Sequence, residues 1–399
     1  MLGCGADDGL LPPLPPPPPR PRPTGDRELD ERALLDWCTA TLNPEQRDVY
    51  NEVNAYLHRR REWMHQKREW QAKKRTFDEL PHLAQDPGPA PAQPSAPRLF
   101  VTGPAGTGKS HVIEAIKLRV ERWAREQGIS GTAVLITATT GIAALNVNGI
   151  TLHSALRLPL TGKFPGEKAI EKLREKYKDL VLLVVDEVSM LGASTLKQLN
   201  YALNSIWNEN PELLADTYFG NCAVLLTGDF LQLPPVMTTP IFTEPWTLNK
   251  REAAEHLVAA TPTHGIRWLF ALFTVFILRR QMRQAGDNTF RDILNRVRLG
   301  LRVPTDMAAL RARIIPREQV QSGAYLAGPL GSVPHLFNMV IPATRFNIRR
   351  VVQHATKEQQ ALYLFKCWEM PNPSDEDVNE CPVVTRENLA RAATGGHQQ

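Results

Sequence analysis

An eight-residue run, GPAGTGKS at residues 103–110, constrains the fold of this chain more than any other feature. A strand-like apolar segment, residues 99–102, precedes it, and a helical pattern, residues 111–125, follows it. Glycines let the backbone turn so tightly that successive N–H groups point at one anion, and the N-terminus of the following helix adds its dipole. A strand, a glycine-rich loop and a helix in this order predict a nucleoside triphosphate site.

The chemistry of this loop assigns a task to each of its last two residues. Lys109 is predicted to reach the β- and γ-phosphates, and the hydroxyl of Ser110 to hold Mg²⁺. The alternative, a glycine-rich turn with a solvated lysine, does not account for the flanking strand and helix. The backbone that would cradle ATP comprises Gly103, Pro104, Ala105, Gly106, Thr107 and Gly108.

Composition limits the class of protein. The chain has 399 residues, of which 42% are hydrophobic, enough for two or three domains with real cores. No apolar run reaches the ~18 residues that a membrane span needs, and the start carries no hydrophobic signal segment. We therefore expect an intracellular protein without a membrane partner. The five cysteines are odd in number and scattered, so they indicate neither a disulfide framework nor a zinc site.

Two proline-rich stretches lie in the N-terminal part. Residues 11–23 favour extended polyproline II, which builds no packed core, and we expect a disordered tail there. Pro15, Pro18 and Arg20 have the spacing of an SH3-type ligand, although a plain linker is the favoured interpretation. Residues 86–97 mark the entry into the nucleotide-binding part.

Between these stretches, apolar residues recur every seven positions and predict one stripe along a helix, formed by Val49, Tyr56, Trp63, Trp70 and Phe77. Residues 59–75 hold eight basic and two acidic side chains, a net charge of +6, whereas the whole chain carries +5. Two interpretations stay open. In the commoner case the stripe packs on the core and the charges are solvated. In the other, the basic residues follow a phosphate backbone while the rings stack on bases.

After the loop, three nearly continuous apolar runs, residues 133–136, 180–185 and 223–226, are typical of buried parallel strands in a doubly wound α/β sheet. Such a sheet binds its ligand at the carboxyl ends of its strands. Asp186 and Glu187 follow the second run. We predict that Asp186 holds Mg²⁺ and that Glu187 deprotonates the attacking water. Gln232, in the loop after the third run, is predicted to sense the γ-phosphate.

Seven runs, in order, carry a resemblance to a known family. They read LNPEQ (42–46), GPAGTGKS (103–110), ATTGIAALNVNGITLHSAL (138–156), VDEVSML (185–191), YFG (218–220), GDFLQLPPV (228–236) and MRQAGD (282–287). With these runs the chain resembles the Pif family of superfamily-one DNA helicases, which are relatives of bacterial RecD. The resemblance implies an α/β fold with a RecA-like P-loop NTPase lobe and a second RecA-like lobe.

The resemblance also implies further site residues. Gln46 would read the adenine edge and favour ATP over GTP, and Arg283 would reach the γ-phosphate from the second lobe. The alternative for Arg283 is a solvated arginine, and the alternative for His153 is a core histidine with satisfied hydrogen bonds. The track for single-stranded DNA would be lined by Thr140, Gly141, Thr151 and His153.

The chain departs from the family near its end. A second lobe is expected to begin near Leu272, with apolar strands at residues 275–278 and 336–341 and a helix at residues 345–355 capped by Thr344. Two later family motifs have no match in this sequence: a segment rich in Asn-Gly and Arg-Gly, and a run resembling TIHKSQGQT with its following arginine. We therefore expect a second lobe that is only partial, in a chain truncated before those motifs.

These expectations divide the chain into six segments. They are a disordered proline-rich tail (1–28), an N-terminal helical region with Gln46 and the basic helix (29–85), a proline-rich linker (86–97), the first RecA-like ATPase lobe (98–265), a partial second RecA-like lobe (266–370) and a polar C-terminal tail (371–399).

By resemblance, the expected function is an ATP-dependent DNA helicase. It would move 5′ to 3′ on single-stranded DNA and act at DNA junctions in repair, recombination or telomere maintenance. The alternative is an ATP- and DNA-binding module that does not unwind, whereas a small-molecule kinase would not need the later motifs. Basic clusters at residues 59–61 and 73–75 permit nuclear import, so we expect a nuclear protein, with the mitochondrion as the second choice.

Overall fold

The computed structural model describes residues 18–80, 82, 85–159, 166–207, 218–236, 238–258, 267–282, 288–322 and 333–359. The chain divides into two compact units, Met1–Val303 and Pro304–Gln399. Among the described residues, none of the helices has the length and apolar character needed to cross a bilayer.

The first unit is built on a six-stranded parallel sheet with the order β3-β2-β4-β5-β1-β8. The sequence-based prediction of a doubly wound α/β fold is confirmed, because three of the strands coincide with the predicted apolar runs. The strands are β1 (Arg98–Thr102), β2 (Val134–Ala138), β3 (Ile150–Thr151), β4 (Leu182–Asp186), β5 (Ala223–Gly228) and β8 (Thr274–Ile277).

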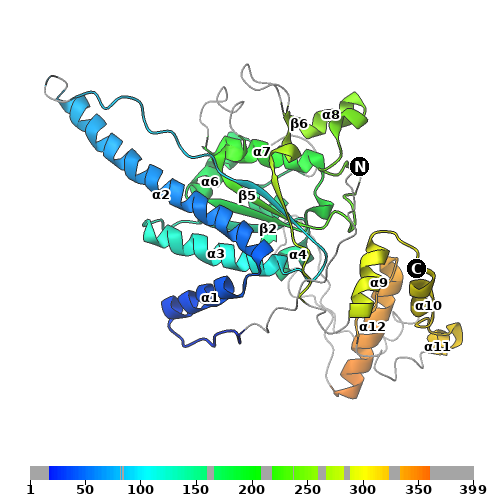
Figure 1. Cartoon of the computed structure of the whole chain (residues 1–399). Coiled ribbons are helices and arrows are strands. Elements are labelled where there is room, and N and C mark those ends of the chain that lie inside the picture. Colours follow the sequence, from blue (N-terminus) through cyan, green and yellow to red (C-terminus); the bar gives the residue numbers. More distant parts are fainter. Residues whose placement is uncertain are drawn as a thin grey trace, which may run out of the picture. The chain divides into compact units, whose positions relative to one another are not determined.

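Helices cover both faces of this sheet (Figure 1). Along β4, Leu183 and Val185 belong to one buried cluster, whereas Leu182 and Val184 belong to the other, because successive strand side chains point to opposite faces. The first cluster includes residues of α5 (Leu152–Leu156), α6 (Glu167–Tyr177) and α7 (Ala193–Trp207). The second includes residues of α1 (Arg27–Thr41), α2 (Pro44–Glu79) and α3 (Lys109–Glu126).

Shorter elements complete the first unit. They are α4 (Gly141–Asn146), α8 (Lys250–His256), the antiparallel pair β6 (Leu257–Val258) and β7 (Arg267–Trp268), α9 (Asn288–Arg298), and the 3₁₀ turns η1 (Val188–Met190), η3 (Phe219–Asn221), η4 (Pro245–Thr247) and η5 (Leu269–Leu272).

The N-terminal segment is more ordered than its proline content predicts. Asp26 caps α1 by accepting hydrogen bonds from the Glu28 and Leu29 N–H groups, so the helix begins inside the expected disordered tail. Upstream, the Trp37 indole donates to Pro18 O (2.8 Å), and Arg20 pairs with Glu114 of α3 (2.6 Å). The expectation of disorder is therefore wrong for residues 18–28, because a Pro-rich backbone still offers carbonyls to a neighbouring helix. Residues 1–17 lie outside the described part.

The predicted apolar stripe does form one face of α2, but only its first half reaches the core. Val49 and Tyr56 are buried, whereas Trp63, Trp70 and Phe77 are half-buried. The expected linker, residues 86–97, contacts this helix. The Trp63 indole donates to Pro91 O (3.0 Å), and the Trp70 indole donates to Gly88 O (2.8 Å).

The strand predicted at residues 275–278 exists, but it belongs to the first lobe. β8 pairs in parallel with β1, with Leu99 opposite Thr274 and Thr102 opposite Ile277. The Leu278 N–H continues the ladder by donating to Thr102 O at 2.7 Å, and Leu278 is fully buried. The expected start of a second lobe near Leu272 is therefore wrong, since the division between compact units falls after Val303.

The second unit is helical where it is described, with α10 (Pro304–Arg311), α11 (Arg317–Ser322) and α12 (Val340–Lys357). The strand predicted at residues 336–341 is absent, and Leu336 is 97% exposed, so it has no sheet to join. The predicted helix exists but begins earlier, at Val340. Thr344 is not its cap, because its hydroxyl donates to Val340 O inside the helix (3.0 Å). No strand supports a RecA-like lobe in the described part of this unit.

The central strand β4 supplies a test of the core. Leu183 is fully buried, so Leu183→Ala should lower the free energy of unfolding by about 2–5 kcal/mol, because the substitution removes buried apolar surface and leaves a cavity. Leu29→Ala, at a position that is 57% exposed on α1, is the control and should change it by about 0.5 kcal/mol or less. Urea unfolding measures both variants. Equal midpoints for the two variants would contradict the assigned core.

Candidate functional site

The loop between β1 and α3 has the backbone that a phosphate cradle needs. Gly106 and Gly108 adopt left-handed conformations, with φ of 84° and 81°. Gly103 lies so close to Leu278 O that a Cβ at this position would collide with it. These three positions therefore require glycine, and the loop ends where Gly108 caps the N-terminus of α3.

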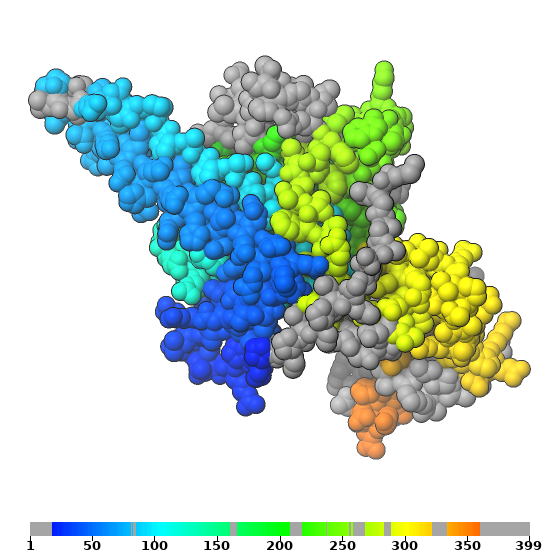
Figure 2. All heavy atoms as spheres, in the orientation of Figure 1, coloured from blue at the N-terminus to red at the C-terminus, as the bar shows by residue number. Residues whose placement is uncertain are grey.

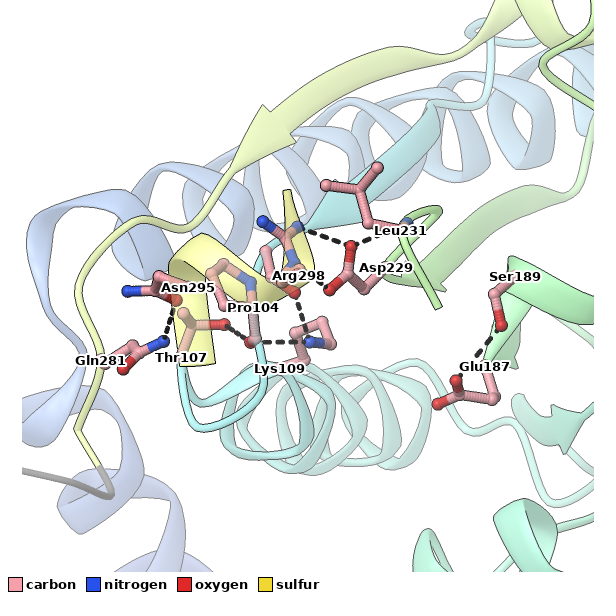
Figure 3. Close-up of polar contacts among 11 residues, drawn as sticks. Pro104, Thr107, Lys109, Glu187, Ser189, Asp229, Leu231, Gln281, Asn295 and Arg298 are labelled. Atoms are coloured by element: carbon pink, nitrogen blue, oxygen red, sulfur yellow. Dashed lines mark hydrogen bonds and ion pairs between the residues drawn. The ribbon is translucent and has the colours of Figure 1, made fainter. Parts of the chain in front are cut away.

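Lys109 folds back over this loop. Its ammonium group donates to Gly103 O (2.8 Å) and to Pro104 O (3.1 Å), and Figure 3 labels Lys109 and Pro104. Burial lowers the pKa of Lys109, while the carboxylates of Asp229, Asp186 and Glu187 act in the opposite direction. The predicted phosphate-binding lysine is thus half-buried beside three acidic groups that come from the ends of two neighbouring strands.

Asp186 and Glu187 lie where the sequence predicted them, at the carboxyl end of β4. The Thr227 hydroxyl, from the next strand, donates to the Asp186 carboxylate at 2.5 Å and fixes its orientation. Glu187 adopts a left-handed φ of 55°, which is strained for a residue with a Cβ. Burial and the neighbouring Asp186 charge raise the pKa of Glu187, although the Ser189 hydroxyl at 3.3 Å acts against this rise.

Asp229, after β5, makes the strongest charged contact of the site. The Arg298 guanidinium from α9 binds both carboxylate oxygens, at 2.7 and 2.6 Å (Figure 3). Burial alone would raise the pKa of Asp229, but the hydrogen bonds from Arg298 and from the Leu231 N–H (3.1 Å) outweigh it and hold the pKa below its ordinary value.

Arg298 is the functional candidate that the sequence did not single out. The available signal was indirect: an aspartate at the end of a buried strand needs a cation, and three arginines of α9, at positions 291, 296 and 298, could supply it. Only the packing of α9 against the strand ends selects Arg298 as the partner.

Gln46 is fully buried at the start of α2 and contacts the phosphate loop directly. Its side-chain oxygen accepts from the Asn43 N–H (2.9 Å), and its side-chain nitrogen donates to Thr107 O (3.0 Å). A Cβ on Gly108 would collide with this nitrogen. The structure therefore places the residue predicted to read adenine at the loop, where it also braces Thr107.

Gln232 and Arg283 are the two residues predicted to act on the γ-phosphate. Gln232 is exposed in the turn after β5, where its N–H donates to Asp229 O (2.9 Å). Met282 is the residue before Arg283, and its N–H donates to Gly106 O (2.8 Å). The chain leading toward Arg283 therefore contacts the phosphate loop. Arg283 itself lies outside the described residues. The phosphate-contacting roles of both residues stay predictions.

The four residues predicted to line a DNA track lie on two adjacent strand ends. Thr140 caps α4 by accepting from the Ala143 N–H (3.2 Å), and Thr151 caps α5 by accepting from the Ser154 N–H (3.3 Å). β2 and β3, which lead into these helices, pair in parallel with Ala138 opposite Thr151.

Their exposure suits contact with a ligand. Gly141 is exposed, and Thr140, Thr151 and His153 are half-buried. Burial lowers the pKa of His153, which favours a neutral imidazole. Ile142 of α4 is 77% exposed beside them.

The PIF1-like helicase family model matches residues 90–304, more than half of the chain and all the site residues except Gln46. This chain belongs to the PIF1-like helicase family. The matched region contains the phosphate loop, the ends of β2 to β5 and α9, so the family assignment covers the same elements that form the site.

Individual relatives agree with the family. ATP-dependent DNA helicase PIF1 of Saccharomyces cerevisiae is 36% identical over 210 residues, 51% of this chain and 21% of that protein. ATP-dependent DNA helicase PIF1 of Emericella nidulans is 33% identical over 220 residues, 53% of this chain and 26% of that protein. The crystal structure of Bacteroides Pif1 bound to ssDNA is 25% identical, covering 59% of this chain and 53% of that one with a TM-score of 0.37. The chain matches about a fifth to a quarter of the length of these curated relatives.

The Asp229–Arg298 pair generates a prediction about acid stability. Because the folded-state pKa of Asp229 lies below its ordinary value of 3.8, the pair stabilises the fold above that pH, and this stabilisation disappears as the pH falls through the folded pKa. Arg298→Ala should therefore lower the melting temperature at about pH 7, and the difference from wild type should narrow below about pH 4.

Melting curves across this pH range check the prediction. Arg122→Ala, which removes an exposed i,i+4 pair with Glu126, is the control and should have a small effect at every pH. A difference between Arg298→Ala and wild type that stays constant down to about pH 3 would contradict the role assigned to the pair.

Proposed function

We propose that this chain forms the ATPase lobe of an ATP-dependent DNA helicase. One observation carries the proposal: a phosphate loop, its acidic partners and the two helix N-termini of α4 and α5 lie along the same carboxyl edge of one parallel sheet. β4 ends at Asp186 of the proposed nucleotide site, and β2 leads to Thr140 of the proposed DNA track. These two strands are adjacent in the sheet. Movement at the nucleotide is then transmitted to the DNA through paired strands.

The nucleotide chemistry follows from the residues present. The loop of residues 103–110 and Lys109 suit the phosphates of ATP, and Gln46 is proposed to read the adenine. Ser110, exposed at the start of α3, and Asp186 offer the hydroxyl and carboxylate oxygens that Mg²⁺ prefers, and the ion would neutralise phosphate charge. Glu187 would accept the proton of the attacking water, and its raised pKa makes the carboxylate a stronger base. Gln232 and Arg283 are proposed to contact the γ-phosphate.

The proposed substrates are single-stranded DNA and DNA junctions. Thr140, Gly141, Thr151 and His153 would contact the backbone of one strand through hydroxyl, backbone and imidazole groups. The family membership supports 5′-to-3′ movement and roles in repair, recombination or telomere maintenance, with a nuclear location and the mitochondrion as second choice. The basic clusters at residues 59–61 and 73–75 support nuclear import.

An SH3-type partner for the tail is a weaker proposal. Pro18 and Arg20 already contact α1 and α3, so such a partner would have to displace these contacts. Pro15 lies outside the described residues.

Two substitutions at the nucleotide site separate binding from hydrolysis. Lys109→Ala should abolish ATP hydrolysis and most ATP binding, because it removes the positive charge nearest the loop. Glu187→Gln should keep ATP binding and lower turnover by about 10² to 10⁴-fold, because it preserves the shape and removes the base. Equilibrium binding of a fluorescent ATP analogue and a phosphate-release assay measure the two effects. Equal affinity in wild type and Lys109→Ala would refute the assignment of the nucleotide site.

The DNA function is tested by strand displacement on a 5′-tailed duplex, with and without ATP. ATP-dependent displacement that Lys109→Ala abolishes would support the helicase function. The double variant Thr140→Ala, Thr151→Ala should weaken single-strand binding and leave ATP binding within about twofold, because both threonines belong to the proposed track and neither belongs to the proposed nucleotide site. Both hydroxyls also cap helices, so circular dichroism must show that the variant is folded. Binding of ATP and DNA without displacement would identify the alternative function, a module that does not unwind. Unchanged single-strand affinity in the double variant would contradict the proposal that these residues contact the DNA strand.

A further inference from the structure

The second half of α2 and the described segment that follows it form a projection, residues 58–80 and 85–97, which we call the arm. The buried residues of α2 end at Leu57, and the helix continues for six turns to Glu79 without another buried side chain. In Figures 1 and 2 this part of the helix extends away from the sheet. The family model begins at residue 90, so the helical part of the arm lies outside the family match.

The sequence of the arm repeats every seven residues. Residues 59–65, 66–72 and 73–79 read RRREWMH, QKREWQA and KKRTFDE. Since an α-helix turns once in 3.6 residues, positions seven apart lie nearly above one another, about 10.5 Å apart along the axis. The repeat therefore draws straight rows along the helix: Trp63, Trp70 and Phe77 form one, and Arg61, Arg68 and Arg75 form another.

The aromatic row is already occupied by the protein itself. Trp63 and Trp70 donate to the carbonyls of Pro91 and Gly88, which holds the returning segment against the helix. Lys67 lies over the Trp63 ring at 4.9 Å, and Lys74 lies over the Phe77 ring at 5.2 Å. These rings brace the arm, and the hypothesis that they stack on bases loses its support.

The arginine row lies about half a turn away from the aromatic row, on the opposite side of the helix. Arg61, Arg68 and Arg75 are all exposed. Arg75 pairs with Glu79 at 2.9 Å, but both side chains are more than half exposed, so the pair is weak and easily exchanged. Arg68 donates from Nε to Met64 O of its own helix at 3.2 Å. The three arginines thus follow one another on one side of the helix over about 21 Å.

We propose that the arm binds the phosphate backbone of double-stranded DNA. The charge complements a polyanion: residues 59–75 carry +6, more than the +5 of the whole chain. Proteins that hold single strands combine charge with free aromatic rings, and here the rings are engaged. A straight row of arginines without free rings suits a backbone that is itself regular and rigid, whose bases are paired and stacked. The inference rests on the proposed function, in which duplex DNA lies next to the single strand at a junction.

The test neutralises the row in the full chain. In Arg61→Gln, Arg68→Gln, Arg75→Gln, affinity for a blunt duplex should fall, and the slope of log affinity against log salt should flatten by about 0.9 for each phosphate that the variant no longer neutralises. Affinity for a single-stranded oligonucleotide should change by less than about twofold, since the proposed track is untouched. Fluorescence anisotropy over a salt series measures both.

A matched control removes equal charge elsewhere. Lys168, Lys172 and Lys176 are exposed on α6, and their replacement by Gln should leave the duplex slope unchanged. A second variant, Trp63→Phe, Trp70→Phe, keeps the rings and removes both indole hydrogen bonds. It should increase proteolysis within residues 85–97 without changing single-strand affinity. If the rings instead stacked on bases, loss of the indoles would change single-strand affinity and would not expose residues 85–97 to protease.

The outcomes distinguish failure of the proposed duplex binding by the arm from failure of the proposed helicase function. Duplex affinity that is equal in wild type and the arginine variant, with both folded by circular dichroism, would overturn the proposal, and so would an equal loss on single-stranded DNA. If wild type shows no ATP-dependent strand displacement, the proposed helicase function fails. The arm's preferential binding to duplex would still be measured independently by the salt series.

Discussion

The parallel pairing of β1 between β5 and β8 is the constraint on which the rest of the site depends. This pairing fixes the end of β1, so the phosphate loop must start at Gly103 against Leu278 O, where no side chain fits. On the other side, β5 delivers Thr227 and Asp229 to the same edge. The loop is therefore set in place by backbone ladders on both sides, and its own glycines only have to close the turn.

The charges at that edge must also be balanced, because Lys109 lies there beside Asp186, Glu187 and Asp229. A half-buried lysine next to three carboxylates is favourable only if the carboxylates are themselves satisfied. Thr227 does this for Asp186 and Arg298 does it for Asp229, whereas among the described residues the Glu187 carboxylate accepts a hydrogen bond from the Ser189 hydroxyl, at the longer distance of 3.3 Å. The group with the poorest partner has a raised pKa, which is the property that a general base for water requires. Structure and chemistry thus distinguish neighbouring acidic residues that look alike in sequence.

The parts of the fold that the sequence predicted are those encoded by local patterns. The loop glycines, the buried runs of β2, β4 and β5 and the acidic pair after β4 are short-range signals, and the structure confirms these elements. The sequence failed where a partner distant along the chain decides the outcome. The strand at residues 275–278 carries no mark that assigns it to β1, and Arg298 differs from its neighbours Arg291 and Arg296 only through packing. An apolar run at residues 336–341 suggested a strand, but no neighbouring strand is present among the described residues, and the run forms irregular backbone and the start of α12.

The hydrogen bond from Gln46 to Thr107 gives α2 a mechanical role. This helix of 36 residues is about 54 Å long, with the contact to the phosphate loop at its first turn and the arm at its far end. Buried residues from Val49 to Leu57 pack the part of the helix near the loop into the core, whereas the far end has no buried side chain. A load on the arm would therefore reach Thr107 through continuous helix, without passing through any flexible connection. The far end of α2 and the phosphate loop are thereby joined by one continuous helix.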